Sequence, residues 1–512
     1  NLKMSSVEVQ CCRPRQSHCP LTASSTFLSH PVPSPDGMIG RVIDVSDRML
    51  ICSSSNMRNE VVVGGADHAL YAIDVNESSS KGTVDQMRRN AASKPYKTMY
   101  SKTCGHSDWV TSVTHLTDGR VLSSGMDGKL CLWSESNRSV CINLENSNSS
   151  GDAFPVSKVL SDIRYNIALS CSYSGVISIW SLGSSDDSGM IQENSYPSSS
   201  SSSSSRVKSS TARVSSGHGR KQTSVATSTM ISPHSHLLGH TEPVLECSYR
   251  DNICVSGDKA GGMLVWDLSR AQLKHRFRAH PGPVSGIEIE SNGIIFSSGT
   301  EGGVKLWDPR LAGTGLVCKL QPFMVPLQEP PPPAAPPRGR SRSASKASAS
   351  RTTPATAVTP VTRCSSPAVS AMAISHSARG PCDANYLLVG SGGGGGASAV
   401  ALVDLRQASD YRQQVVSMWS HSRNGVYSMC VVGDSCLLVG DGVGQLLSYS
   451  LLGEQSTVGK AAGDVAYGSA DQALRYAVGA SSKGAVRAIQ CLAGKVVTAG
   501  EDGKVLVLDY AL

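Results

Sequence analysis

The sequence predicts an all-β fold made of repeated small sheets, and two observations support this prediction. First, small residues, a turn containing glycine, an alternating apolar strand and a closing aromatic recur at a period of roughly 40 residues, as in 122–133 and 296–307. Second, four of the six tryptophans fall at one position of this repeat, namely Trp133, Trp180, Trp266 and Trp307. A unit this small cannot bury its own apolar face, so its neighbours must cover it. The units are therefore interpreted as one array.

Eight such units can be recognised from their third strands. Each of these strands ends about six residues after a turn, and they close on Ile73, Trp133, Trp180, Trp266, Trp307, Val403, Tyr449 and Leu508. Upstream of several units, a Gly-His pair or a weaker form of it precedes a short apolar first strand, as at Gly105-His106 and Gly239-His240. Four short strands per unit at this spacing are typical of a propeller blade. We expect eight blades, and seven remain an alternative because the first unit is weak.

The last unit ends at Leu512, directly after its third strand. Its fourth strand must therefore come from elsewhere, and the segment 38–45 is well placed to supply it. A propeller closed in this way leaves no sheet edge exposed between its first and last units. We expect this N-terminal strand to complete the last blade.

We expect 1–37 to form a mostly flexible tail and 38–512 to form a single propeller domain. Four inserts are expected to interrupt it as disordered loops, because they lack the apolar side chains needed to offset the entropy lost on ordering. These inserts cover about 76–94, 183–234, 326–365 and 453–470.

The formal net charge of +7 comes almost entirely from one insert. Between 330 and 365 there is no acidic residue, and the basic residues there are Arg338, Arg340, Arg342, Lys346, Arg351 and Arg363. The rest of the chain is nearly neutral and lacks the folded basic face that nucleic-acid binding needs. Binding of RNA through 338–363 is therefore an alternative function, and nucleic acid is otherwise not expected as a partner.

The sixteen cysteines are dispersed and form no Cys-x-x-Cys pair. This pattern favours reduced thiols in an intracellular protein, in the cytoplasm, the nucleus or both. No apolar run reaches the length of about 18 residues that a membrane helix needs, and the first residues do not resemble a secretory signal. We expect no membrane partner.

The repeats resemble those of the WD40-repeat β-propeller family over about 39–510. In that family a structural tetrad joins four side chains of one blade by hydrogen bonds, and the resemblance implies this role for His106, Ser124, Asp127 and Trp133. A buried histidine and a buried aspartate that satisfy each other are structural rather than catalytic. The second unit alone is expected to carry the whole set, because Ala260 and Glu301 hold the acid position in the fourth and fifth units.

The segment 295–310 also resembles the WDxR box of substrate receptors that dock on the adaptor of cullin-4 RING ubiquitin ligases. By this resemblance Asp308 and Arg310 would contact that adaptor, because an arginine fork offers directional hydrogen bonds. The alternative, a solvated arginine in a turn, stays open.

The remaining candidates lie where the family binds peptides, on the top face, which is the end of a blade where the first strand begins. They are Trp109, Met126, Arg423, Tyr427 and Arg487, chosen because exposed aromatics and arginines anchor interfaces. Packing of Trp109 on the next blade is the alternative. The sequence lacks paired carboxylates, metal-ligand spacing and a nucleophile motif. We therefore expect a scaffold that binds proteins or peptides, with no enzymatic activity, cofactor or metal.

Overall fold

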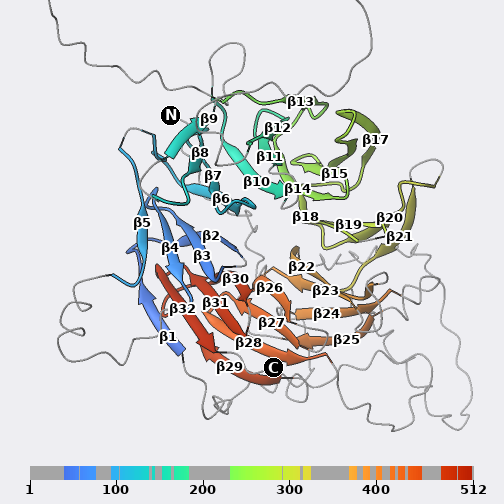
Figure 1. Ribbon diagram of the computed structural model, residues 1–512. Helices are drawn as coiled ribbons and strands as arrows, with labels where there is room; N and C mark the ends of the chain where they lie inside the picture. Colours follow the sequence, from blue (N-terminus) through green and yellow to red (C-terminus); the bar gives the residue numbers. More distant parts are fainter. Residues whose placement is uncertain are drawn as a thin grey trace, which may run out of the picture. The chain divides into compact units, whose positions relative to one another are not determined.

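The computed structural model describes most of the chain from residue 40 onward. The described residues are 40–56, 58–76, 94–102, 104–137, 141–144, 153–162, 167–183, 231–290, 292–311, 315–323, 368–376, 384–392, 399–405, 415–420, 425–432, 436–451, 474–492 and 494–509. Over these ranges the protein is all-β and contains no helix. The strands form eight four-stranded sheets in a propeller arrangement, as the repeats predict, and they can be followed by their labels in Figure 1.

The first four blades follow one another along the chain, and each uses its strands in sequence order. Blade 1 contains β2 (Leu50–Ser55), β3 (Glu60–Gly65), β4 (Leu70–Asp74) and β5 (Lys97–Met99). Blade 2 contains β6 (Val110–His115), β7 (Val121–Gly125), β8 (Leu130–Trp133) and β9 (Cys141–Leu144). Blade 3 contains β10 (Val156–Asp162), β11 (Ile167–Ser172), β12 (Val176–Ser181) and β13 (Ser235–Leu238). Blade 4 contains β14 (Val244–Arg250), β15 (Ile253–Asp258), β16 (Gly262–Asp267) and β17 (Gln272–Arg278).

The next three blades repeat this order, and the eighth departs from it. Blade 5 contains β18 (Val284–Ile289), β19 (Ile295–Gly299), β20 (Val304–Trp307) and β21 (Leu316–Leu320). Blade 6 contains β22 (Val369–His376), β23 (Ala384–Ser391), β24 (Ala399–Asp404) and β25 (Val415–Ser420). Blade 7 contains β26 (Val426–Val432), β27 (Cys436–Asp441), β28 (Gln445–Ser450) and β29 (Leu474–Gly479). Blade 8 contains β30 (Val486–Leu492), β31 (Lys495–Gly500), β32 (Lys504–Asp509) and β1 (Gly40–Asp44).

The N-terminal strand completes the last blade, as predicted. β1 pairs antiparallel with β32, from Gly40 opposite Leu508 to Asp44 opposite Lys504. Ile43 is 4% exposed and belongs to one apolar cluster with Val505 and Val507 of β32 and Val61 of blade 1. The strand therefore covers the edge of β32 and also contributes to the core between blades 8 and 1.

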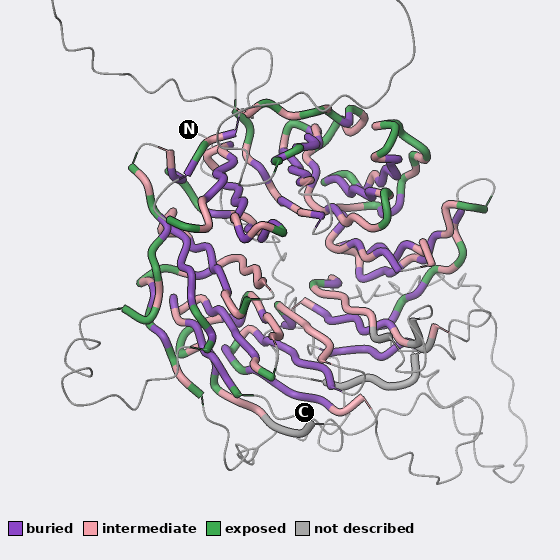
Figure 2. The backbone as a smooth tube through the Cα atoms, viewed as in Figure 1, coloured by how far each residue is buried: buried purple, intermediate pink, exposed green. Residues whose placement is uncertain are grey.

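The middle strands of each blade carry the core. β3, β7, β15 and β31 are buried almost throughout, and so are the third strands beside them, whereas the outer strand β17 is mostly exposed. Figure 2, in which buried residues are purple and exposed residues green, shows this difference between middle and outer strands. Strands buried on both faces read as continuous apolar runs rather than as an alternation. Two third strands end on the residue that the repeat predicts, at Trp133 and Trp307, and the other six end one residue later than predicted.

A register shift recurs at the start of every first strand. It falls around the second residue of the strand, for example between Val110 and Ser112 of blade 2 and between Val426 and Ser428 of blade 7. Such a bulge redirects the side chain of the extra residue. Where this residue is Thr111 or Ser157, its hydroxyl donates to a carbonyl oxygen of the next blade, Val156 at 2.6 Å and Val244 at 2.7 Å. These hydroxyls join neighbouring blades.

The described chain falls into two compact units. One comprises Lys259–Met263 and His275–Gly479, and the other comprises Asp36–Asp258, Leu264–Lys274 and Ala480–Leu512. Blades 5, 6 and 7 lie in the first unit, and blades 8, 1, 2 and 3 lie in the second. The predicted tail 1–37 lies outside the described residues, as do most of the four predicted inserts, so the single domain and its disordered loops stay predictions.

Candidate protein-binding surface

Blade 2 carries a complete tetrad, but its serine is not the predicted one. His106 Nε2 lies 2.8 Å from Ser123 Oγ, Trp133 Nε1 donates to the same oxygen at 2.8 Å, and His106 Nδ1 lies 3.2 Å from Asp127 Oδ1. Ser124, the predicted member, instead lies 2.9 Å from Thr111 Oγ1. Ser123 rather than Ser124 binds Trp133 because successive side chains of a strand point to opposite faces of the sheet, and Ser123 is on the same face as Trp133.

Two further blades carry complete tetrads, contrary to the prediction. In blade 4 the acid is Asp258, the last residue of β15, whose Oδ2 lies 2.8 Å from His240 Nδ1. The carboxylate therefore comes from a position two residues before Ala260, where the sequence pattern had placed it. Ser256 joins His240 at 2.7 Å and Trp266 at 2.9 Å. In blade 5 the longer Glu301 replaces aspartate, with its Oε1 2.5 Å from the ring of His280.

The blade 5 set is completed by Ser297. It lies 2.9 Å from His280 Nε2 and accepts the Trp307 indole N–H at 2.8 Å. All three histidine rings are buried, and each has one ring nitrogen beside a serine hydroxyl and the other beside a carboxylate. The arrangement satisfies buried polar groups and leaves no histidine nitrogen open to a substrate.

Blade 8 shows what happens where the tetrad is incomplete. Thr498 occupies the serine position and is 1% exposed, but Leu508 and Ser481 stand where blade 2 has tryptophan and histidine. Its Oγ1 has no hydrogen-bond partner among the described residues. An unsatisfied buried hydroxyl of this kind costs about 1–3 kcal/mol.

The charge of Asp127 contributes to stability in a definite pH window. Burial would raise its pKa, but the contact with His106 and the backbone N–H groups of Ser107 and Lys129 outweigh it and lower the pKa to about 2. A pKa below the unfolded value stabilises the fold above about pH 4, and this contribution is lost as the pH falls through about 2. The uncharged Asp127→Asn variant is therefore expected to lose less stability than the wild type between these pH values, measured by urea unfolding. Equal losses in both proteins would contradict the prediction.

The tetrad of blade 2 supports an exposed aromatic on the top face. Trp109 directly precedes β6, is 43% exposed, and lies in the loop that begins at His106. Its backbone N–H donates to Asp108 Oδ1 at 2.7 Å, and its backbone carbonyl accepts the backbone N–H of Met126 at 2.9 Å. The backbone of Trp109 is thus fixed by two hydrogen bonds, while a large part of the residue stays exposed to solvent.

A second aromatic of the same face was missed by the sequence reasoning. Phe154 precedes β10 of blade 3 and is 38% exposed. Gly128, in the turn that also holds Met126, has φ of 75°, and a Cβ at this glycine would lie 2.9 Å from the Cβ of Ala153. The loops of blades 2 and 3 therefore touch, and we call Trp109, Met126 and Phe154 the aromatic patch. The sequence signal for Phe154 was its position just before a first strand, which resembles that of Trp109.

Two of the other top-face candidates occupy bulge positions. Tyr427 and Arg487 are the extra residues of the first strands of blades 7 and 8, and Tyr427 is 40% exposed. Arg487 donates through Nε to Glu501 Oε1 at 2.7 Å. Both residues thus occupy the bulge position that Thr111 holds in blade 2. Arg423 lies outside the described residues.

Arg310, the predicted adaptor-binding residue, is exposed and forms hydrogen bonds with Asp308 of its own blade. The side chain of Arg310 is 65% exposed, and its Nε and Nη2 donate to the two carboxylate oxygens of Asp308 at 2.8 and 2.9 Å. This hydrogen bond lowers the pKa of Asp308. The guanidinium is therefore oriented by its own blade.

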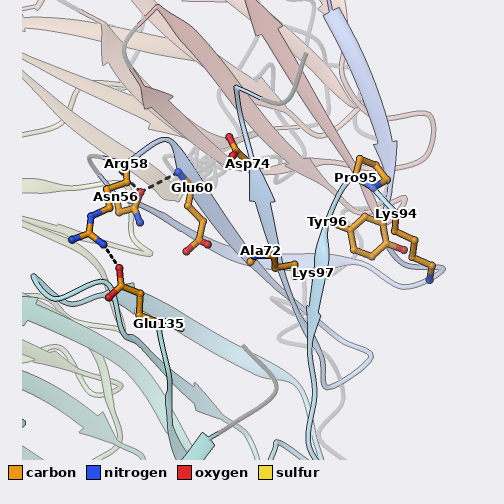
Figure 3. A pocket seen from close by; sticks show the side chains of 10 residues that line it. All are labelled: Asn56, Arg58, Glu60, Ala72, Asp74, Lys94, Pro95, Tyr96, Lys97 and Glu135. Atoms are coloured by element: carbon orange, nitrogen blue, oxygen red, sulfur yellow. Dashed lines mark hydrogen bonds and ion pairs between the residues drawn. The ribbon is translucent and has the colours of Figure 1, made fainter. Parts of the chain in front are cut away.

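A polar hollow of about 340 Å³ opens beside blade 1 (Figure 3). Charged side chains line most of it; Arg58 pairs with Glu135 of blade 2, and Lys94 lies 5.3 Å from the ring centre of Tyr96. No histidine, cysteine or serine lines it. Charged side chains therefore dominate the lining of the hollow.

A set of serine, histidine and carboxylate side chains shares Glu60 with the lining of this hollow. His115 is 5% exposed, with Nδ1 2.9 Å from Ser54 Oγ and Nε2 3.3 Å from Glu60 Oε1. Ser54 Oγ also accepts the backbone N–H of His115 at 3.1 Å. The serine hydroxyl is used to join blades 1 and 2, which satisfies the buried ring.

The described ranges contain neither a cluster of metal ligands nor a membrane-spanning helix. No three histidine, cysteine or acidic side chains within them are grouped to hold a metal ion. None of the described segments forms a helix that could cross a membrane.

The geometry and the comparisons define the class of protein. Residues 96–134 and 271–308 match the WD40 family model, described as "WD domain, G-beta repeat". Together with the eight four-stranded sheets, these matches identify the fold as a WD40-repeat β-propeller. The WD40 resemblance inferred from the repeats is confirmed.

Among curated proteins, two yeast relatives match a short part of the chain. ASTRA-associated protein 1 of Clavispora lusitaniae is 34% identical over 76 residues, which is 15% of this chain and 21% of that protein. The protein of the same name from Schizosaccharomyces japonicus shows the same identity and coverage. The match spans about a fifth of the length of these relatives.

Solved structures resemble the whole propeller. Sqt1 of Chaetomium thermophilum, bound to the N-terminus of the ribosomal protein L10, is 15% identical; the match covers 91% of this chain and 98% of Sqt1, with a TM-score of 0.56. Sqt1 of Saccharomyces cerevisiae is 11% identical over 92% of this chain and 98% of its own, with a TM-score of 0.57. At this identity the likeness establishes the fold. The fold and these relatives are consistent with a protein-interaction scaffold.

Proposed function

We propose that this chain is a non-catalytic scaffold that captures a protein segment on the top face of blades 2 and 3, through the aromatic patch. The observation that carries the proposal is Trp109: it stays 43% exposed although backbone hydrogen bonds hold its loop. A large aromatic fixed in solvent loses little entropy on binding and buries much apolar surface. Such residues dominate the energy of protein interfaces.

The relatives support this class of partner. Sqt1, which shares the fold, was solved with the N-terminus of a ribosomal protein, and the name of the yeast relatives states association with ASTRA. We therefore infer a peptide segment of a protein as the ligand. The described cysteines are present as thiols, which fits a reducing compartment, the cytoplasm or the nucleus.

The test compares two exposed apolar residues of blade 2. Trp109→Ala is expected to lower recovery of the principal partner at least about tenfold in quantitative affinity purification, because a central aromatic anchor contributes about 2 kcal/mol or more. Ile142→Ala is the control: Ile142 is 42% exposed, but it lies on the outer strand β9. Equal recovery with Trp109→Ala and the wild type, or equal losses in both variants, would reject the aromatic patch as the binding site.

The adaptor contact through Asp308 and Arg310 stays a prediction. The oriented and exposed guanidinium is compatible with it, and Arg310→Ala is expected to abolish recovery of the cullin-4 adaptor if the contact exists. Unchanged recovery would remove this alternative. The RNA alternative concerns 338–363, which lies outside the described residues.

A further inference from the structure

Two cysteines that are far apart in sequence meet in blade 2. Cys104 lies in the loop before β6, and Cys141 is the first residue of the outer strand β9. Their sulfur atoms are 2.6 Å apart. A disulfide bond is about 2 Å long, so only a small approach separates the two thiols from a covalent link.

The surroundings of the pair favour a thiolate. Hydrogen bonds to the side chains of Cys131, Cys104 and Ser101 and the charge of Lys129 outweigh burial and lower the pKa of Cys141 to about 7. The Ser101 hydroxyl lies 3.1 Å from Cys104 Sγ. The thiolate is the reactive form of cysteine, so these contacts increase the reactivity of Cys141.

The pair is less deeply buried than a second close cysteine pair of the protein. Cys104 is half-buried, and Cys141 is 8% exposed. A second close pair, Cys247 and Cys254 of blade 4, has its sulfur atoms 3.4 Å apart and is completely buried. The protein thus contains a matched internal control, with close sulfurs but no access.

We propose that Cys104 and Cys141 form an oxidation site, which a peroxide converts into a disulfide. The Cys141 thiolate attacks a peroxide oxygen; the S–O bond forms, the O–O bond breaks, and the leaving oxygen takes a proton as water or an alcohol. Cys104 Sγ then attacks the Cys141 sulfur; the S–S bond forms, the S–O bond breaks, and hydroxide leaves with the proton of the Cys104 thiol as water. The two thiols are oxidised by two electrons and the peroxide is reduced by two.

The link would change the loop that presents the aromatic patch. Cys104 directly precedes Gly105-His106, and the same loop continues to Trp109. A disulfide would tie this loop to the start of β9 and restrict its motion. The oxidation site itself does not depend on the proposed partner binding, and its test does not use a partner.

The test oxidises the full chain with hydrogen peroxide, alkylates the remaining thiols and maps digested peptides by mass spectrometry without reduction. We expect a linked pair of peptides that contain Cys104 and Cys141, lighter than the separate thiol peptides by two hydrogens. Reduction before alkylation should restore both thiols. Cys247 and Cys254 should be recovered unlinked, once the quenched protein is unfolded and alkylated.

The variant Cys104→Ser sharpens the result. It removes the second sulfur, so the linked peptides should disappear, and a sulfenic acid probe should instead label Cys141. The proposal is overturned if wild-type protein yields no link between the two cysteines, or if either one is linked to another cysteine instead. Because the first measurement uses wild-type protein, poor folding of the variant would not affect it.

Discussion

Ser123→Ala is expected to lower the free energy of unfolding by about 2–4 kcal/mol, because one hydroxyl serves two buried partners. Its oxygen lies 2.8 Å from His106 Nε2 and accepts the Trp133 indole N–H at 2.8 Å. Removing it leaves both groups buried without a partner, and each such group costs about 1–3 kcal/mol. The measurement is urea unfolding of the full chain, with the wild type in the same assay.

The adjacent Ser124→Ala is the matched control. Ser124 lies 2.9 Å from Thr111 Oγ1, and that hydroxyl keeps its bond to the Val156 carbonyl when Ser124 is replaced. We expect a loss of about 1 kcal/mol, the value of one ordinary hydrogen bond. A larger loss at Ser124 than at Ser123 would mean that the tetrad assignment is wrong.

Ile43→Ala is expected to cost about 2–4 kcal/mol, because it opens a cavity in the cluster that joins blades 8 and 1. Ile43 is 4% exposed there, beside Val61 and Val505. The residue belongs to a strand of only five residues, whose pairing with β32 completes the last blade. The loss should appear as a lower urea midpoint.

Val42→Ala tests the same strand on its other face. Val42 is 57% exposed, so its truncation is expected to change stability by no more than about 0.5 kcal/mol. Equal losses at Val42 and Ile43 would show that the strand acts through pairing alone and that its side chains do not contribute to the core.

The sequence was sufficient to predict the serine of each tetrad but not every acid. The serine that binds tryptophan lies ten residues before it in four blades, at Ser123, Ser170, Ser256 and Ser297. This constant spacing was present in the sequence and would have excluded Ser124. Asp258 was harder to predict, because blades 2 and 5 have glycine at the corresponding strand end, and only the folded distance shows that its carboxylate reaches His240.

The sequence by itself determined the repeat, the eight third strands, the outer strand contributed by 38–45 and the tryptophan positions. All of these follow from local periodicity, or from counting strands within a repeat. Only the tertiary structure decided which acid completes each tetrad, that Phe154 lies beside the turn of blade 2 that contains Gly128, and that Cys104 and Cys141 meet. These facts depend on side chains from separate strands and loops, brought together at ångström distances by packing that no local pattern encodes.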